Sequence, residues 1–60
     1  MEKIVKTFTV RGMTVTIIET VYWAGGSRMM ASEYRYIRSD GISELGFTRQ
    51  RDAEQAARLR

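Results

Sequence analysis

Two long runs of alternating side chains, joined across Gly25-Gly26, occupy residues 14–38 and constrain the fold more than any other feature. β-branched and aromatic residues that alternate with polar ones at period two are typical of half-buried β-strands. Gly-Gly between two such runs indicates a hairpin, because glycine adopts the positive φ that a tight reversal requires. The remaining segments can be placed by pairing them against this predicted hairpin.

Shorter alternating runs flank the central pair on both sides. The runs and the dipeptides that separate them follow one another in this order: 2–10, Arg11-Gly12, 13–23, Gly25-Gly26, 28–38, Asp40-Gly41 and 42–47. Each dipeptide is typical of a two-residue hairpin turn. The sequence therefore predicts four antiparallel strands, each joined to the next by a tight turn.

The spacing of apolar residues becomes helical after Phe47. Ala53, Ala56 and Ala57 recur at the i, i+3, i+4 spacing of a helix face, and Thr48 is a suitable N-cap. A helix of about eleven residues is barely stable alone, so we expect it to dock on the sheet. Small alanine side chains would allow a close approach.

Three two-residue turns would determine which residues face each other, and facing residues lie on the same side of a sheet. In that register Val15 faces Tyr36, and Tyr36 faces Leu45. The large apolar side chains then gather on one face: Phe8, Val15, Ile17, Tyr34, Tyr36, Leu45 and Phe47. The opposite, outer face carries threonines and an outward apolar pair: Thr7, Thr9, Thr14, Thr16, Val5 and Ile18. We predict a single α+β domain over residues 1–60, a four-stranded antiparallel β-meander in the order 1-2-3-4 with one C-terminal helix packed on the apolar face.

The composition limits the chemistry available to this chain. Its 60 residues include neither Cys nor His, which excludes disulfides, thiolate metal sites and histidine bases. The carboxylates show no pairing typical of acid–base or metal chemistry, so we expect a protein that is not an enzyme and needs no cofactor. No segment reaches the ~20 apolar residues of a transmembrane helix, and the first residues lack a signal-peptide pattern. We therefore expect a cytoplasmic protein.

A mild excess of basic residues is compatible with nucleic-acid binding. Ten Lys and Arg stand against seven Asp and Glu, which gives a net charge of +3. Arg49 and Arg51 fall near the predicted helix N-terminus, where the helix dipole disfavours cations, and contact with phosphate would explain them. The candidate nucleic-acid contacts, on the outer sheet face and near the helix start, are Lys3, Thr7, Thr16, Arg35, Arg49 and Arg51.

The middle hairpin is longer than its neighbours, so its end, at about residues 20–31, should have few flanking strands. Tyr, Trp, Met and Arg are the residue types that anchor protein interfaces, and this end is rich in them. The candidate partner-binding residues are those of the ribbon end together with the outward apolar pair: Tyr22, Trp23, Arg28, Met29, Val5 and Ile18.

Three segments of the second half pass from an aromatic strand through a glycine turn into a short strand and a helix: Tyr34-Arg35-Tyr36-Ile37-Arg38, Glu44-Leu45-Gly46-Phe47 and Asp52-Ala53-Glu54-Gln55-Ala56. In this order they resemble the small N-terminal arm-binding domains of phage tyrosine integrases. The resemblance implies a three-stranded sheet, backed by a helix, that inserts into the major groove of DNA. In size and in lacking cysteine, the chain is also similar to small phage inhibitors such as anti-CRISPR proteins.

Three functions remain open at this point. The first hypothesis is a nucleic-acid-binding module of a phage or mobile element that uses the outer sheet face and the basic residues. The alternative is an inhibitor that occludes a host protein complex through the ribbon end, from Tyr22 to Met29. The third is a structural homodimer formed through an edge strand or through the outer sheet face.

Overall fold

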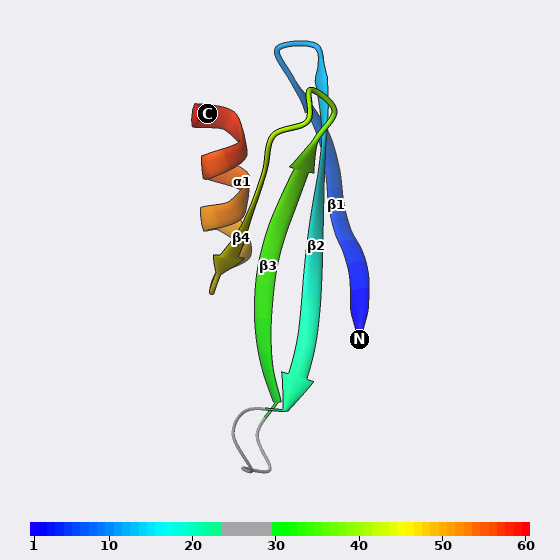
Figure 1. Ribbon diagram of the computed structural model, residues 1–60, viewed down its shortest axis with the longest axis vertical. Coiled ribbons are helices and arrows are strands. Elements are labelled where there is room, and N and C mark those ends of the chain that lie inside the picture. Colours follow the sequence, from blue (N-terminus) through cyan, green and yellow to red (C-terminus); the bar gives the residue numbers. More distant parts are fainter. Residues whose placement is uncertain (24–29) are drawn as a thin grey trace.

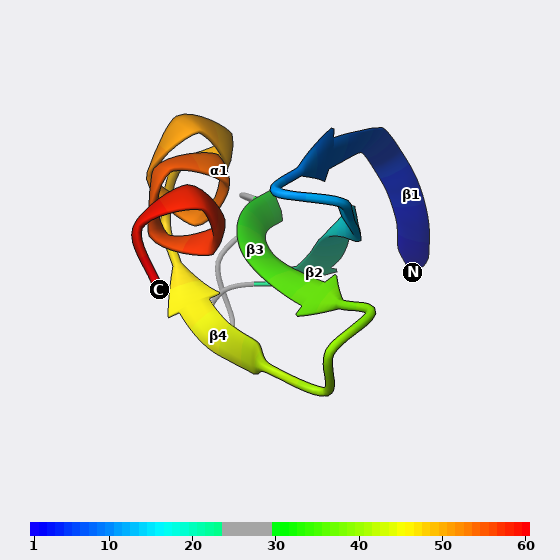
Figure 2. The ribbon, with the colours of Figure 1, turned by 90° about the horizontal axis from the view of Figure 1, so that it is seen from above.

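The computed structural model describes residues 1–23 and 30–60, which form one sheet and one helix. The elements are β1 (Glu2–Val10), β2 (Met13–Trp23), β3 (Met30–Arg38), β4 (Ser43–Phe47) and α1 (Gln50–Leu59). The strands are antiparallel and lie in the order β1-β2-β3-β4 (Figure 1). Helix α1 packs on one side of the sheet, against β2, β3 and β4, and no described element covers the other side (Figure 2). The predicted α+β meander with a C-terminal helix is confirmed.

The turn between β1 and β2 contains two residues, as predicted, and Arg11 and Gly12 both have positive φ, of 49° and 78°. The predicted pairing holds along most of this hairpin and then changes at a β-bulge, where β1 contains one extra residue. Beyond the bulge Ile4, rather than Val5, faces Ile18, and Val5 packs against the core. The prediction that Val5 points outward beside Ile18 is therefore wrong, because one extra residue exchanges the two faces of a strand.

The register between β2 and β3 differs from the predicted one by two residues. Val15 faces Arg38 rather than Tyr36, and the last described pair is Trp23 with Met30. A shift of two leaves every residue on its predicted face, because side chains alternate with a period of two. Three predicted features lie outside the described residues: the reversal at Gly25-Gly26, Arg28 and Met29.

Arg38 and Ile42 are the last paired residues before the turn from β3 to β4, so the turn contains three residues rather than the predicted two at Asp40-Gly41. The backbone N–H of Arg38 donates to the carbonyl of Ile42 across it, at 2.8 Å. Gly41 has a φ of 94°, the left-handed conformation that closes three-residue hairpin loops. The extra residue moves β4 by one position relative to the predicted register.

A β-bulge at Gly46, whose φ is 93°, moves the register back. Between the turn and this bulge, Glu44 rather than Leu45 faces Tyr36, and beyond it Phe47 has its predicted partner. Leu45 is 75% exposed on the outer face, so its predicted place in the core is wrong.

The core lies between the sheet and α1. Among residues 1–23 and 30–60, five hydrophobic side chains are fully buried: Val15, Ile17, Tyr36, Ala53 and Ala57. Partly buried side chains packed around them are Val5, Phe8, Val10, Tyr34, Phe47 and Ala56. Arg49 is the N-cap of α1 and makes no side-chain capping bond, so the prediction of Thr48 as the cap is wrong.

Candidate functional site

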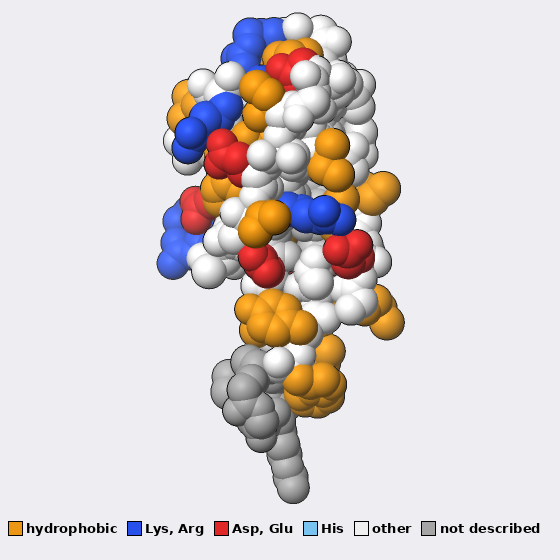
Figure 3. All heavy atoms as spheres, in the orientation of Figure 1, with side chains coloured by type: hydrophobic (Ala, Val, Ile, Leu, Met, Phe, Trp, Pro, Cys, Tyr) orange, Lys and Arg blue, Asp and Glu red, His pale blue; other side chains and the backbone are white. Residues whose placement is uncertain are grey.

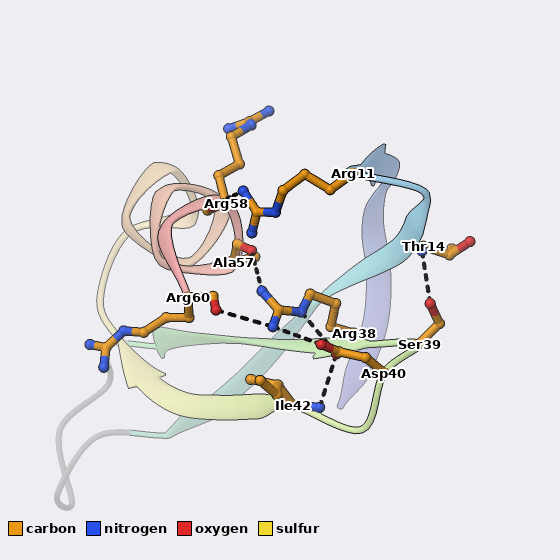
Figure 4. A network of polar contacts seen from close by, with 9 residues as sticks. All are labelled: Arg11, Thr14, Arg38, Ser39, Asp40, Ile42, Ala57, Arg58 and Arg60. Atoms are coloured by element: carbon orange, nitrogen blue, oxygen red, sulfur yellow. Dashed lines mark hydrogen bonds and ion pairs between the residues drawn. The ribbon is translucent and has the colours of Figure 1, made fainter.

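Arg38, at the end of β3, is the only charged residue in the described chain that is fully buried, with 3% of its surface exposed. Its Nε and Nη2 donate to the two carboxylate oxygens of Asp40, at 2.8 Å each. Nη1 donates to the carbonyl of Ala57 at 3.0 Å, and Nη2 also donates to that of Arg60 at 3.2 Å (Figure 4). Carbonyls in the last turn of a helix lack partners within it, and a cation there complements the helix dipole. Because four of the five guanidinium N–H donors are engaged within the chain, this network joins β3 to α1 and is a structural contact rather than a ligand site.

Two further bonds strengthen the same end of the molecule (Figure 4). Arg11, in the first turn, donates from Nη1 to the carbonyl of Arg58 at 2.7 Å. The backbone N–H of Thr14 donates to the hydroxyl of Ser39 at 3.0 Å. The β1–β2 turn, the β3–β4 turn and the end of α1 are therefore held together by polar contacts.

Most basic residues of the described chain are paired with carboxylates. The ion pairs are Lys3–Glu19 (3.5 Å), Lys6–Glu54 (2.7 Å), Arg35–Glu2 (3.2 Å), Arg38–Asp40 (2.8 Å), Arg58–Glu54 (3.8 Å) and Arg60–Glu44 (3.2 Å). Arg49 and Arg51 are exposed, and neither has a carboxylate partner within residues 1–23 and 30–60. Carboxylates of the same chain thus offset most of the basic side chains, and the two exposed arginines without such a partner lie at the start of α1.

The six candidate nucleic-acid contacts lie on two opposite sides of the sheet. Thr7 and Thr16 face each other on the outer face, which Arg35 shares. Lys3 faces Glu19 on the helix side and pairs with it, so its predicted place on the outer face is wrong; the bulge in β1 turns it over. The remaining two candidates, at the start of α1, also lie on the helix side. The structure therefore does not bring the six residues together.

Beyond Glu33, the β2–β3 ribbon extends past α1 and β4 (Figure 1). Three large side chains near its end are exposed: Tyr22 to 45%, Trp23 to 64% and Met30 to 58%. Trp23 and Met30 face each other across the two strands, so they form a single exposed pair. Hydrophobic side chains gather at this end of the space-filling view, next to the segment drawn in grey (Figure 3). Tyr22 and Trp23 are thus exposed at the ribbon end, and their binding role stays a prediction.

The outer sheet face carries more apolar surface than the sequence predicted. Ile4 is 65% exposed, Leu45 75% and Ile37 43%, and Ile18 lies between them, partly buried. Sequence reasoning missed Ile4 and Leu45, because each lies beside a bulge. The glycine at position 46 was a usable signal, since a glycine inside a strand pattern often marks a bulge.

Two adjoining hollows lie around Arg35. The larger, of about 210 Å³, is lined by Glu2, Thr20, Glu33, Tyr34, Arg35 and Leu45. The smaller, of about 160 Å³, is lined by Arg35, Tyr36, Ile37, Gly41, Ser43, Glu44 and Leu45. Arg35 and the exposed Leu45 line both hollows. A guanidinium beside an apolar side chain suits contact with a protein side chain that is partly apolar and partly polar.

Three carboxylates accept short hydrogen bonds that favour their charged form. The hydroxyl of Tyr34 donates to Glu19 at 2.8 Å, and this bond lowers the pKa of Glu19. The ammonium of Lys6 lowers the pKa of Glu54, and the guanidinium of Arg38 lowers that of Asp40. The folded state therefore holds these three protons less tightly than the unfolded chain does.

We expect thermal stability to be constant at neutral pH and to fall as the solution is acidified. Lowered pKa values stabilise the fold above the ordinary values of 3.8 for Asp and 4.5 for Glu, and this contribution is lost as the pH falls through the lowered values. Circular dichroism melts from pH 7 down to about pH 2 would measure the loss. Glu54→Gln should weaken the pH dependence, whereas Gln55→Ala, at an exposed residue of the same helix that carries no titratable group, should not. Identical profiles for the two variants would contradict this account.

In the part of the chain that the structure describes, the single helix is too short and too polar to cross a membrane. Comparison with protein-family models, with curated proteins and with solved structures finds none that matches this chain.

Proposed function

We propose that this chain is a non-enzymatic protein-binding module that contacts its partner through the end of the β2–β3 ribbon. The observation that carries the proposal is the cross-strand pair of Trp23 and Met30, exposed to 64% and 58%, with Tyr22 beside it. Trp and Tyr side chains contribute much of the binding energy of protein interfaces, and Met is enriched in them. A single exposed apolar residue needs no explanation, but an exposed cross-strand pair at one end of a ribbon, with a third exposed ring on the other face, does.

The distribution of charge supports a protein partner over a polyanion. A nucleic-acid surface needs cations that are free to replace counterions on phosphates. Here six basic side chains already contact carboxylates of the same chain. A small module of this kind would act by occluding a surface of a cytoplasmic host complex, as small phage inhibitors do.

Nucleic-acid binding remains a second candidate because Arg49 and Arg51 are exposed and lack carboxylate partners among the described residues. It predicts that the affinity for duplex DNA falls steeply with salt, and that Arg51→Ala weakens binding more than Arg11→Ala. Arg11 is a suitable control because its guanidinium is already bonded to a carbonyl of α1. No salt-dependent binding to DNA or RNA would remove this candidate.

The test of the main proposal is capture of a protein partner from a host lysate, with and without nuclease. Trp23→Ala and Met30→Ala should each abolish capture, whereas Leu59→Ala, at an apolar residue of α1 that is 75% exposed, should leave it intact. Circular dichroism should give the same spectrum and melting midpoint for all three, since none of the three side chains is buried. Capture that survives both ribbon variants would show that the ribbon end is not the site. Capture that depends on nucleic acid would favour the second candidate.

A further inference from the structure

The outer sheet face is an uncovered surface with an apolar middle. Helix α1 covers only the opposite side, whereas Ile4, Ile18, Ile37 and Leu45 lie on the outer face among threonines. An antiparallel sheet with one face in water normally alternates apolar residues inward with polar residues outward. A contiguous group of exposed apolar side chains on such a face marks a contact surface.

The charges on this face are self-complementary. Arg35 uses only Nη2 to bond Glu2, at 3.2 and 3.3 Å, and its Nε, which is buried, has no partner in the described chain. Glu33 lines the same hollow and has no ion pair within residues 1–23 and 30–60. The face thus carries an arginine with unused donors and a carboxylate without a cation. In a two-fold interface every such contact is made twice, since residue i meets j and j meets i.

The size of the face and of the core also points to a second copy. The eleven residues of β2 span roughly 36 Å, and four strands cover roughly 14 Å, so the face measures roughly 500 Å² in projection. Protruding side chains enlarge its accessible area toward the ~800 Å² per partner of a standard interface. A chain of 60 residues has only one small core, and a second layer of sheet would add another.

We propose that two copies of this chain pack their outer faces together as a two-layer β-sandwich. The exposed apolar side chains of one copy (Ile4, Ile18, Ile37 and Leu45) lie against those of the other, and Glu33 of each copy pairs with Arg35 of its partner. Two sheets packed in this way lie about 10 Å apart with their strands inclined at about 30°. Tyr22 lies on the outer face, but Trp23 and Met30, the pair that carries the site proposed above, lie on the helix side of the ribbon and do not depend on this interface.

The first test is the mass in solution, measured by sedimentation equilibrium on the full chain. Leu45 and Leu59 form a matched pair, because both are 75% exposed and they lie on opposite sides of the sheet. The wild type and Leu59→Glu should sediment with twice the mass of the chain, and Leu45→Glu with its single mass. A monomeric wild type, or equal masses for the two variants, would overturn the proposal. A Leu45→Glu variant that is still a dimer would also overturn the proposal, and would indicate that the chain associates through an edge strand instead.

The second test uses charge exchange between two variants. E33K copies would meet like charges at both Arg35 contacts, and R35E copies would meet like charges at both Glu33 contacts, so each variant alone should be monomeric. A mixture of the two restores an opposite pair at both contacts and should form a mixed dimer. Circular dichroism on each variant verifies that it is folded. If the mixture remains monomeric while the wild type is a dimer, the Glu33–Arg35 contact is wrong.

Discussion

Replacing Arg38 with alanine is expected to lower the midpoint of thermal unfolding by on the order of 15 °C, whereas the same change at Arg35 should move it by a few degrees at most. Both arginines lie on β3 and pair with a carboxylate, but their side chains are exposed to 3% and 36%, respectively. Truncating the buried one leaves the carbonyls of Ala57 and Arg60 without a donor and opens a cavity beneath α1. Truncating the exposed one removes a solvated ion pair with Glu2.

A second variant separates hydrogen bonding from packing. Arg38→Met fills much of the same volume but has no donor, so we expect it to remain well below the wild type in thermal stability. Melts followed by circular dichroism would measure this, with wild type, Arg38→Ala, Arg38→Met and Arg35→Ala side by side at a concentration low enough to keep the chain monomeric, so that the place of Arg35 in the proposed dimer has no effect. A methionine variant as stable as the wild type would contradict the role given to the four hydrogen bonds of Arg38.

The position of Arg38 illustrates what alternation in a sequence can and cannot predict. Its parity along the strand is that of Tyr34 and Tyr36, so the pattern itself places it on the face that α1 covers. What makes a buried guanidinium tolerable there is the set of acceptors around it, from the β3–β4 turn and the end of α1. Those acceptors come together only in the folded chain, so a local sequence pattern cannot predict them.

The faces of β2 and β3 could be predicted from the sequence even though their register could not. Alternation assigns each residue to a face, and a shift of two residues exchanges partners while it preserves that assignment. Ile17 and Tyr36 are therefore in the core as expected, although the predicted partner of Tyr36 was Val15. An error of one residue would have reversed every side chain of a strand.

Single-residue irregularities account for the parts of the site that could not be predicted. In β1, Ile4 and Val5 are both β-branched, and such a side chain is favourable on either face of a strand. The local sequence therefore does not indicate the bulge that buries Val5 and exposes Ile4. In β4, the three-residue turn and the bulge at Gly46 offset each other, so Ser43, Glu44 and Leu45 change sides whereas Phe47 does not. The bulges in β1 and β4 thus add Ile4 and Leu45 to Ile18 and Ile37 on the outer face.

The second large effect is expected at Tyr36, where alanine and phenylalanine should behave in opposite ways. Tyr36 is the largest fully buried side chain, and its ring lies 6.2 Å from that of Phe47. Truncating a buried aromatic ring to alanine costs about 3–5 kcal/mol. A chain of 60 residues has a total stability of roughly 3–9 kcal/mol, so Tyr36→Ala should be largely unfolded. Tyr22→Ala, at an exposed ring of the neighbouring strand, is the matched control and should melt with the wild type.

Tyr36→Phe removes only the hydroxyl, and we expect it to be as stable as the wild type or more so. That hydroxyl is buried, and in the described part of the chain it has no hydrogen bond of ordinary geometry. Burial, together with the nearby carboxylate of Glu44, raises the pKa of Tyr36, so the group stays neutral at physiological pH. A buried hydroxyl without a partner opposes folding, and its removal relieves that cost. A melting midpoint for Tyr36→Phe well below that of the wild type would mean that the hydroxyl does bond in solution, to Glu44 or to a water molecule, and that the core depends on a polar contact.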